Sequence, residues 1–181
     1  MKRLAYVPVL LLSLGLNVWY GLPFLFPDLD YGDWTLWVLV LLYLCSVASF
    51  IVLARNPDGG YALMALALAA KVLLIPWFAV NFLFGVLLFF GGFIIPLNWF
   101  GLPGVVLADL LMLVLTSLYG SVGIYRFFSK HRMRYAPLWI ALEWLYVLDL
   151  VSAIVAFVLA SQQTKREKTF NQADLPKRSV R

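Results

Sequence analysis

Long apolar runs alternate along the chain with short polar or turn-forming segments, and this pattern predicts membrane-spanning helices. Because a helix rises about 1.5 Å per residue, about 20 apolar residues are needed to cross a hydrocarbon core roughly 30 Å thick. Runs of about this length cover residues 4–26, 34–54, 61–81, 105–128 and 136–160. We therefore expect an all-α fold, a polytopic transmembrane helical bundle of about five spans that forms a single domain over residues 1–160.

The composition agrees with this class and excludes a soluble globular domain. Of the 181 residues, 64% are hydrophobic and only 13% are charged, and the mean hydropathy is +0.91. Soluble domains contain roughly 25% charged residues. The net charge of +5 would suggest a nucleic-acid partner for a soluble protein, but here Lys and Arg cluster at the ends of apolar runs, which is typical of orientation in a bilayer. The expected partner is therefore the lipid bilayer and not nucleic acid.

The polar segments between the runs predict how the helices are connected. Asp28, Asp30 and Asp33 form an acidic segment without Lys or Arg, so this connection should face outward. Residues 55–60 consist mainly of turn formers and predict a tight hairpin between the second and third spans. The first run follows Lys2 and Arg3 and also matches a secretory signal, but its apolar residues continue well past any cleavage site, so we expect a retained helix.

The third apolar run is longer than a bilayer requires. It stays apolar for about 30 residues, which corresponds to roughly 45 Å of helix. Pro76 predicts a kink and Asn81 the end of the span. The uncharged stretch 91–104, rich in Gly, Pro and aromatic residues, predicts a membrane-hugging or re-entrant loop. In an alternative arrangement the chain crosses twice within 61–104, which gives six spans.

Basic residues predict which ends of the helices face the cytoplasm. The densest basic cluster, residues 126–134, follows the fourth run and is therefore expected on the cytoplasmic side. The segment 161–181 is also basic and is predicted to be a disordered tail, which would meet anionic lipid if cytoplasmic or an anionic wall polymer if external. Five spans with a cytoplasmic N-terminus leave this tail outside, and the side of the tail stays open. The basic residues then predicted inside are Lys2, Arg3, Arg55, Arg126, Lys130, Arg132 and Arg134.

Four charged residues lie within the apolar runs: Lys71, Asp109, Glu143 and Asp149. An ionised side chain at the bilayer centre costs at least about 2.5–3.5 kcal/mol, so these groups should be paired or reach water. Counting residues from the cytoplasmic helix ends puts Lys71 at a depth of about 15 Å, between Glu143 at about 10 Å and Asp149 at about 20 Å. We expect Asp149 as the first partner of Lys71 and Glu143 as the second, with Asp109 nearer the outer surface and in contact with water.

Small and polar residues recur at helical spacing beside these charges, and such faces allow transmembrane helices to pack closely. We therefore expect the third, fourth and fifth helices to pack against one another. The residues that define these faces are Asp109, Thr116, Gly120 and Gly123, then Asp149, Ser152, Ala156 and Ala160, and on the third helix Ala65 and Ala69.

The sequence contains no known catalytic signature such as HExxH, GxSxG, a Walker loop or CxxC. No cofactor or metal is therefore expected, and the single cysteine, Cys45, cannot form an intrachain disulfide. If the chain were an intramembrane enzyme, its site would be expected at Asp109, Ser117 and Tyr119. The only histidine, His131, is expected in a solvated basic loop.

Three motifs lie in residues 61–157: Lys71-x-x-x-Ile75-Pro76 with Asn81-Phe82, Asp109 followed by Thr116-Ser117-x-Tyr119-Gly120, and Asp149-x-x-Ser152-Ala153. With these motifs the segment resembles an uncharacterised family of small integral membrane proteins of Gram-positive bacteria. The resemblance implies a helical bundle in the bacterial cytoplasmic membrane and brings no established activity, and the long basic tail departs from the family's pattern.

Two functions are consistent with these patterns. The first is a non-enzymatic membrane module that binds a protein partner or a second copy of itself, as an accessory, sensing or immunity-type protein does. The second is a proton-coupled or small-solute transporter that uses Lys71, Asp109 and Asp149, since ionisable residues inside a membrane often mark transport pathways.

Overall fold

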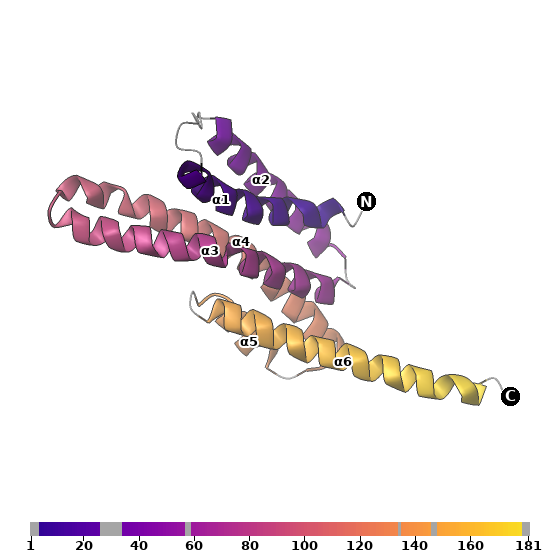
Figure 1. Ribbon diagram of the computed structural model, residues 1–181. Helices are drawn as coiled ribbons and strands as arrows, with labels where there is room; N and C mark the ends of the chain where they lie inside the picture. Colours follow the sequence, from indigo (N-terminus) through magenta and orange to yellow (C-terminus); the bar gives the residue numbers. More distant parts are fainter. Residues whose placement is uncertain (1–3, 26–33, 57–58, 134, 146–147, 179–181) are drawn as a thin grey trace.

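The chain folds entirely into helices over the residues that the computed structural model describes, which are 4–25, 34–56, 59–133, 135–145 and 148–178 (Figure 1). The expected all-α class is confirmed for this part of the chain, and the acidic segment with Asp28, Asp30 and Asp33 lies outside it. Three of the helices, α2, α3 and α4, are long and apolar enough to cross a membrane. The elements are η1 (Leu4–Tyr6), α1 (Val7–Leu25), α2 (Trp34–Ala54), α3 (Gly60–Gly92), η2 (Pro96–Phe100), α4 (Leu102–Lys130), α5 (Ala136–Leu142) and α6 (Asp149–Arg178).

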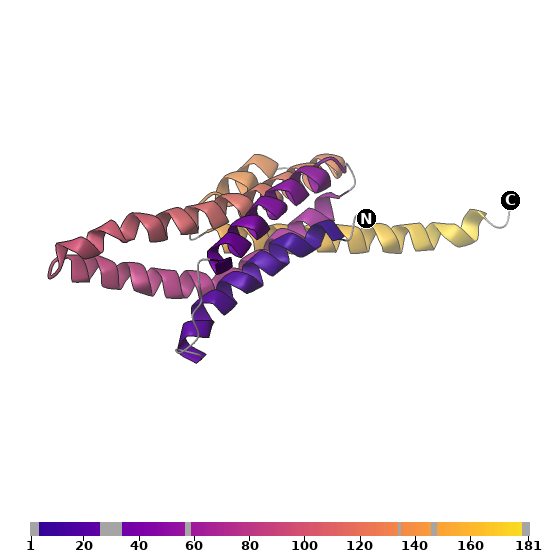
Figure 2. The ribbon, with the colours of Figure 1, turned by 90° about the horizontal axis from the view of Figure 1, so that it is seen from above.

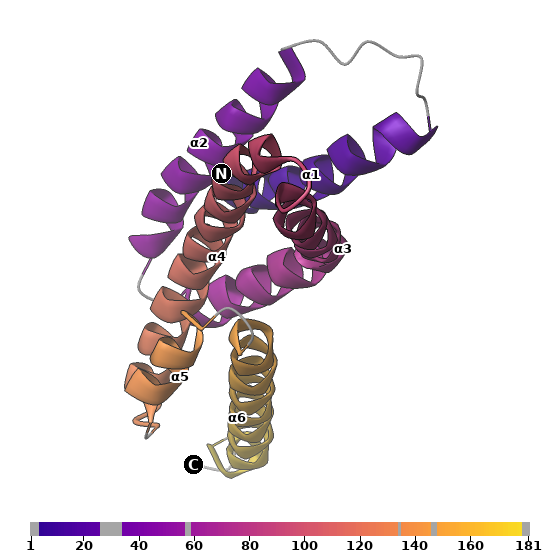
Figure 3. The ribbon, with the colours of Figure 1, turned by 90° about the vertical axis from the view of Figure 1, so that its left-hand side faces the viewer.

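An antiparallel hairpin of α3 and α4 forms the centre of the molecule. Helices α1 and α2 pack on one side of this hairpin, and α5 and α6 pack on the other (Figures 1 and 3). Helices α2 and α4 finish, and α3 begins, at the same end, which carries Arg55, Arg126, Lys130 and Arg132 and which we call the basic end. At the opposite end the tip of the α3–α4 hairpin extends past the other helices (Figures 1 and 2).

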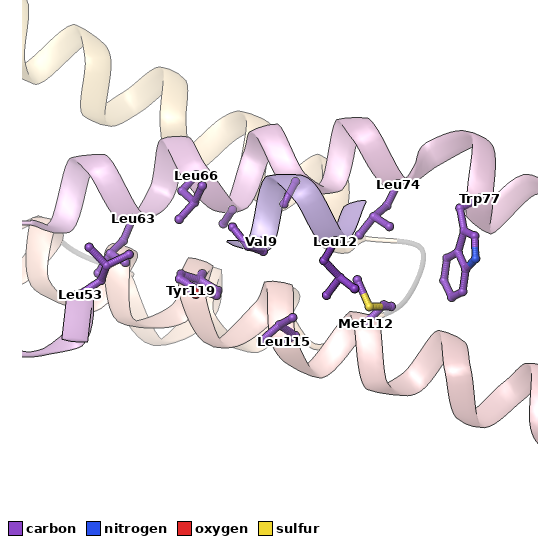
Figure 4. Close-up of a cluster of buried hydrophobic side chains, with 12 residues drawn as sticks. Val9, Leu12, Leu53, Leu63, Leu66, Leu74, Trp77, Met112, Leu115 and Tyr119 are labelled. Carbon is purple, nitrogen blue, oxygen red and sulfur yellow. The ribbon is translucent and has the colours of Figure 1, made fainter. Parts of the chain in front are cut away.

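The main hydrophobic core lies between α3 and the helices α1, α2 and α4 (Figure 4). A second cluster joins α6 to the basic ends of α3 and α4 through Met64, Phe128 and Ala156. Large apolar side chains are also exposed along every long helix, which suits an apolar solvent such as lipid. The buried residues of the main core are Val9, Leu12, Leu53, Leu63, Leu66, Ala67, Ala70, Leu74, Trp77, Met112, Leu115 and Tyr119.

Glycine allows α3 and α4 to approach closely near the basic end. A Cβ on Gly60 would lie 2.9 Å from the backbone nitrogen of Phe127, and a Cβ on Gly123 would lie 2.8 Å from Cγ of Met64. The predicted inward faces of the fourth and last helices are thus confirmed, since Ala156 and Ala160 of α6 are buried as well.

The small-residue pair predicted for the third helix is wrong. Ala69 is exposed and Ala65 is only partly buried. The alanines that α3 turns toward its neighbours are Ala67 and Ala70, which are fully buried.

Helix α3 continues through Pro76 to Gly92, so the helix itself does not end near Asn81. A proline inside a helix removes one backbone hydrogen bond, and neighbouring helices can satisfy the freed groups. Pro76 has no N–H to donate to the carbonyl of Val72, four residues earlier. Asn17 of α1 donates from Nδ2 to the adjacent carbonyl of Leu73 at 2.6 Å, which links α3 to α1 beside the proline. The alternative of two crossings within 61–104 is also wrong, because a single helix fills 60–92.

The Gly-, Pro- and aromatic-rich stretch 91–104 forms a compact tip instead of a long loop. The non-α part of this tip is short, and α4 begins already at Leu102. The Trp99 ring lies directly against Gly92, where any Cβ would overlap it, and Trp99 donates from Nε1 to the carbonyl of Phe89 at 3.2 Å. These contacts close the turn. Gly92 makes the reversal of the chain possible because it leaves room for the Trp99 ring.

The predicted fifth span over 136–160 is not one helix. Helix α5 ends at Leu142, the chain reverses, and α6 begins at Asp149 and returns toward the basic end. Helix α5 is only about 10 Å long, so the reversal lies beside the middle of the α3–α4 hairpin (Figure 1). The segment 143–148 contains no Gly or Pro that would have marked this turn.

The predicted disorder of the basic tail is also corrected, because α6 continues to Arg178 (Figure 2). Residues 161–175 contain no Gly or Pro and are rich in Gln, Lys, Arg and Glu, which are good helix formers. Extending an existing helix avoids the cost of nucleating a new one. The tail therefore prolongs α6 beyond the rest of the bundle.

Candidate functional site

A buried lysine between two carboxylates lies at mid-length of the bundle. Lys71 of α3 forms ion pairs through Nζ with Oε2 of Glu143, just after α5, and with Oδ1 of Asp149, the first residue of α6. The three residues are 3%, 0% and 5% exposed, respectively. Both predicted partners of Lys71 are thus confirmed, and they bind it together. We call Lys71, Glu143 and Asp149 the charge cluster.

Two serines complete the hydrogen bonding of the charge cluster. Ser117 of α4 donates to the backbone carbonyl of Glu143 at 2.5 Å, and its oxygen also lies 3.4 Å from Oδ1 of Asp149. Ser152 of α6 donates to Oε1 of Glu143 at 3.1 Å. The position of Asp149 at the N-terminus of α6 also suits its negative charge, because a helix N-terminus carries a partial positive charge.

The charge cluster is closed to water. The space beside Glu143, bounded by Gly120, Ala67 and Ala153, is too small to hold a water molecule. Gly120 lies so close to the Glu143 carboxylate that any Cβ at this position would overlap it. With all groups ionised the cluster carries one excess negative charge. The ion pairs and hydrogen bonds of the charge cluster thus hold α3, α4 and the α5–α6 turn together, and we call this arrangement the structural lock.

Asp109 lies apart from the charge cluster. It accepts a 2.8 Å hydrogen bond on Oδ1 from Nδ2 of Asn81. Asn81 is ten residues beyond Lys71 on α3, a rise of about 15 Å toward the hairpin tip, and is fully buried, whereas Asp109 is partly buried. The two residues border an apolar groove of about 470 Å³ between the distal halves of α3 and α4. Sequence reasoning used Asn81 only as a helix end and missed this pairing.

The remaining predicted polar residues of α4 make hydrogen bonds outside the charge cluster. Thr116 donates to the carbonyl of Met112 in its own helix at 3.0 Å. Tyr119 donates to the carbonyl of Ser46 in α2 at 2.6 Å and packs edge-on against Phe50. Asp109, Ser117 and Tyr119, considered above as an enzyme site, are therefore not brought together.

Two contacts at the basic end were not foreseen from the sequence. The Arg126 guanidinium donates to the carbonyls of Ala54 and Asn56, where α2 ends. His131 stacks on Phe127 and lies 3.0 Å from a carboxylate oxygen of Glu167 in α6. The basic loop is thus attached to its neighbours, whereas His131 was expected to be solvated.

No group of His, Cys, Asp and Glu suited to holding a metal ion occurs among the described residues. In the charge cluster, the Lys71 ammonium group occupies the position between the carboxylates where a metal cation would bind. Cys45 lies apart, exposed on α2. No protein family, curated protein or solved structure matches this chain.

Proposed function

We propose that this chain is a non-enzymatic, multi-pass module of a bacterial cell membrane that acts by binding a partner within the bilayer. The observation that carries this proposal is the closed charge cluster. A transport pathway needs a water-accessible route to its charged groups, whereas Lys71 is bound by both carboxylates and is only 3% exposed, and the space beside Glu143 is too small for water. The bacterial assignment rests on the resemblance of residues 61–157 to a Gram-positive membrane family.

The arrangement of the helices favours a specific topology. We assign four crossings to α1–α4 and a half-length hairpin to α5 and α6, which enters the membrane from the basic end and returns to it. The basic tail then lies on the same side as the 126–134 cluster. In this proposed topology all Lys and Arg of the chain except Lys71 fall on that side, so the positive-inside rule makes it cytoplasmic. Five crossings would divide the Lys and Arg residues almost equally between the two sides of the membrane, whereas this topology places them on one side.

A half-length hairpin needs support inside a membrane. Backbone groups at a turn lack helical partners, and at bilayer depth they are tolerated only where protein buries them. The charge cluster supplies this support, because both carboxylates flank the turn and Lys71 and Ser117 bind to it from α3 and α4. In this proposal the charges fix a rigid scaffold, and the exposed distal part of the α3–α4 hairpin is the surface that meets the partner.

The proposal is tested by a mutational cycle of unfolding stability in mild detergent. Lys71→Met, Asp149→Asn and the double variant are compared, with Glu143→Gln added to make the triple variant. Lys71→Met should cost about 3–5 kcal/mol, because it strands two buried carboxylates, whereas Asp149→Asn leaves Lys71 paired with Glu143 and should cost less. A triple variant that stays clearly less stable than the wild type supports the structural lock. A triple variant as stable as the wild type overturns it.

A direct search for the partner completes the test. After gentle extraction, crosslinking from the exposed distal position Phe100→Cys in a Cys45→Ala background should trap a discrete partner or a second copy. Recovery of a monomer with no crosslinked product contradicts a binding role.

A second candidate function, proton-coupled transport, is favoured by the excess carboxylate in the charge cluster. A carboxylate without its own counter-ion is a site for an exchangeable proton. Proteoliposomes should then show flux driven by a pH gradient that is lost in Asp149→Asn. Absence of such flux across a broad panel of solutes excludes this candidate.

A further inference from the structure

The groove between the distal halves of α3 and α4 has the size and shape of a small-molecule site. Its volume of about 470 Å³ falls in the range of known ligand sites. Phe82, Phe89 and Phe90 of α3 line it on one side and Leu102 and Val105 of α4 on the other. The wall is therefore apolar and suited to a hydrocarbon chain.

One end of this groove is polar and carries an unsatisfied hydrogen-bond acceptor. Asn81 is fully buried, and its Nδ2 donates to the Asp109 carboxylate at 2.8 Å. Because a carboxylate accepts the bond, the amide orientation is fixed and Oδ1 of Asn81 is an acceptor. This oxygen is buried and has no hydrogen-bond partner in the part of the chain that is described. A buried acceptor without a donor is costly and points to a missing partner.

The charge of the groove restricts the ligand further. Asp109 is the only ionisable acid or base in residues 72–109, so the polar end of the groove is acidic. An anionic head would be repelled there. An apolar transmembrane helix would also leave Asn81 unsatisfied, because its backbone N–H groups are already used within the helix.

We propose that this groove binds an amphiphile with one long hydrocarbon chain and a head that donates hydrogen bonds, such as a primary ammonium or a hydroxyl group. The chain packs among the phenylalanines, and the head donates to Oδ1 of Asn81 beside the Asp109 carboxylate. This proposal rests on the binding role proposed above and adds a small-molecule ligand, of stated chemical class, to the protein partner.

The test compares probes that differ only in their head group. The full chain in lipid nanodiscs is titrated with dodecylamine, dodecanol and dodecyltrimethylammonium, and binding is followed by the shift of the unfolding temperature. The quaternary amine has the same charge as the primary amine and no donor. Dodecylamine should bind saturably and at least tenfold more tightly than dodecyltrimethylammonium, and dodecanol should also bind saturably. Equal affinities of the two amines overturn the proposal.

Two variants locate the binding site. Gly85 borders the groove, and a Cβ there meets only Cδ1 of Leu102 at 3.9 Å, so Gly85→Leu fills the groove without disturbing Asn81. It should weaken dodecylamine binding at least tenfold, whereas Gly104→Leu, at a position with open space, should not. Asn81→Leu should abolish the preference for a donating head. Unchanged binding in Gly85→Leu places the probe elsewhere and overturns the proposal.

The outcome also separates this inference from the proposed function. If crosslinking from Phe100→Cys traps a partner protein while dodecylamine binds no better than the quaternary amine, the binding role stands and the amphiphile proposal fails. If neither a partner nor a probe binds, both fail.

Discussion

The Ser117 hydroxyl donates to the backbone carbonyl of Glu143 across 2.5 Å, and both residues are fully buried. The bond joins the middle of α4 to Glu143, the residue that directly follows α5. A carbonyl at that point has no partner within its own helix. Ser117 therefore satisfies the backbone of a chain reversal that takes place deep inside the bundle.

Ser117→Ala should destabilise the fold by about 1–3 kcal/mol, because it leaves this carbonyl buried and unsatisfied. The measurement is the free energy of unfolding in mild detergent. Ser129→Ala is the matched control, since Ser129 lies on the same helix and is exposed. Equal stabilities of the two variants would show that the hydrogen bond contributes nothing to the fold.

Gly120→Ala should be severely destabilising, whereas Gly104→Ala should be tolerated. A methyl group on Gly120 overlaps the Glu143 carboxylate, while nothing lies within 4 Å of a Cβ on Gly104. Overpacking costs about 1–3 kcal/mol, and displacement of Glu143 also breaks its ion pair with Lys71. Thermal unfolding of both variants checks this, and a Gly120→Ala protein with the stability of the wild type contradicts it.

Gln162 and Ser129 should be accessible from the same side of the membrane, and Phe100 from the other. The test uses single cysteines at these exposed positions in a Cys45→Ala background, labelled with an impermeant maleimide. In intact cells Phe100→Cys should react, and in inverted vesicles Gln162→Cys and Ser129→Cys should react. Labelling of Gln162→Cys from outside intact cells would restore the five-crossing topology.

Arg126→Lys should loosen the end of α2 without unfolding the bundle. The two carbonyls of Ala54 and Asn56 are bound by two nitrogens of one guanidinium, a fork that a lysine ammonium does not reproduce. The expected loss is about 1–2 kcal/mol, given the typical strength of hydrogen bonds to charged groups. Faster hydrogen exchange of the amides in residues 50–56 is the signature, and Arg166→Lys, at an exposed position, should leave that exchange unchanged.

Energetic arguments predicted the partners of Lys71 better than local patterns predicted the helices. An ion in an apolar run must be neutralised, so Glu143 and Asp149 followed from depth alone, and both bind Lys71. The reversal over 143–148 was missed because it contains no turn former. It is held by tertiary contacts with Lys71 and Ser117, which a local pattern does not reveal.

The helix boundaries that were missed have a common physical reason. Pro76 suggested an end, but α3 continues through it, and Asn17 of α1 binds the carbonyl of Leu73 beside the proline. Residues 161–178 looked solvated and disordered, but they continue an existing helix at low cost. In each case the outcome depends on what precedes or packs against the segment, and not on its own composition.

The length of α3 also acts on the membrane around the protein. Its 33 residues correspond to about 50 Å, against a hydrocarbon core of about 30 Å. Each ångström of hydrophobic mismatch costs a fraction of a kcal/mol, which is met by tilting of the hairpin or by local thickening of the bilayer. Where thickening of the bilayer accommodates the mismatch, the lipids that touch the α3–α4 hairpin are under elastic strain, and this strain falls as their acyl chains lengthen. The protein should consequently concentrate in the thickest regions of its membrane.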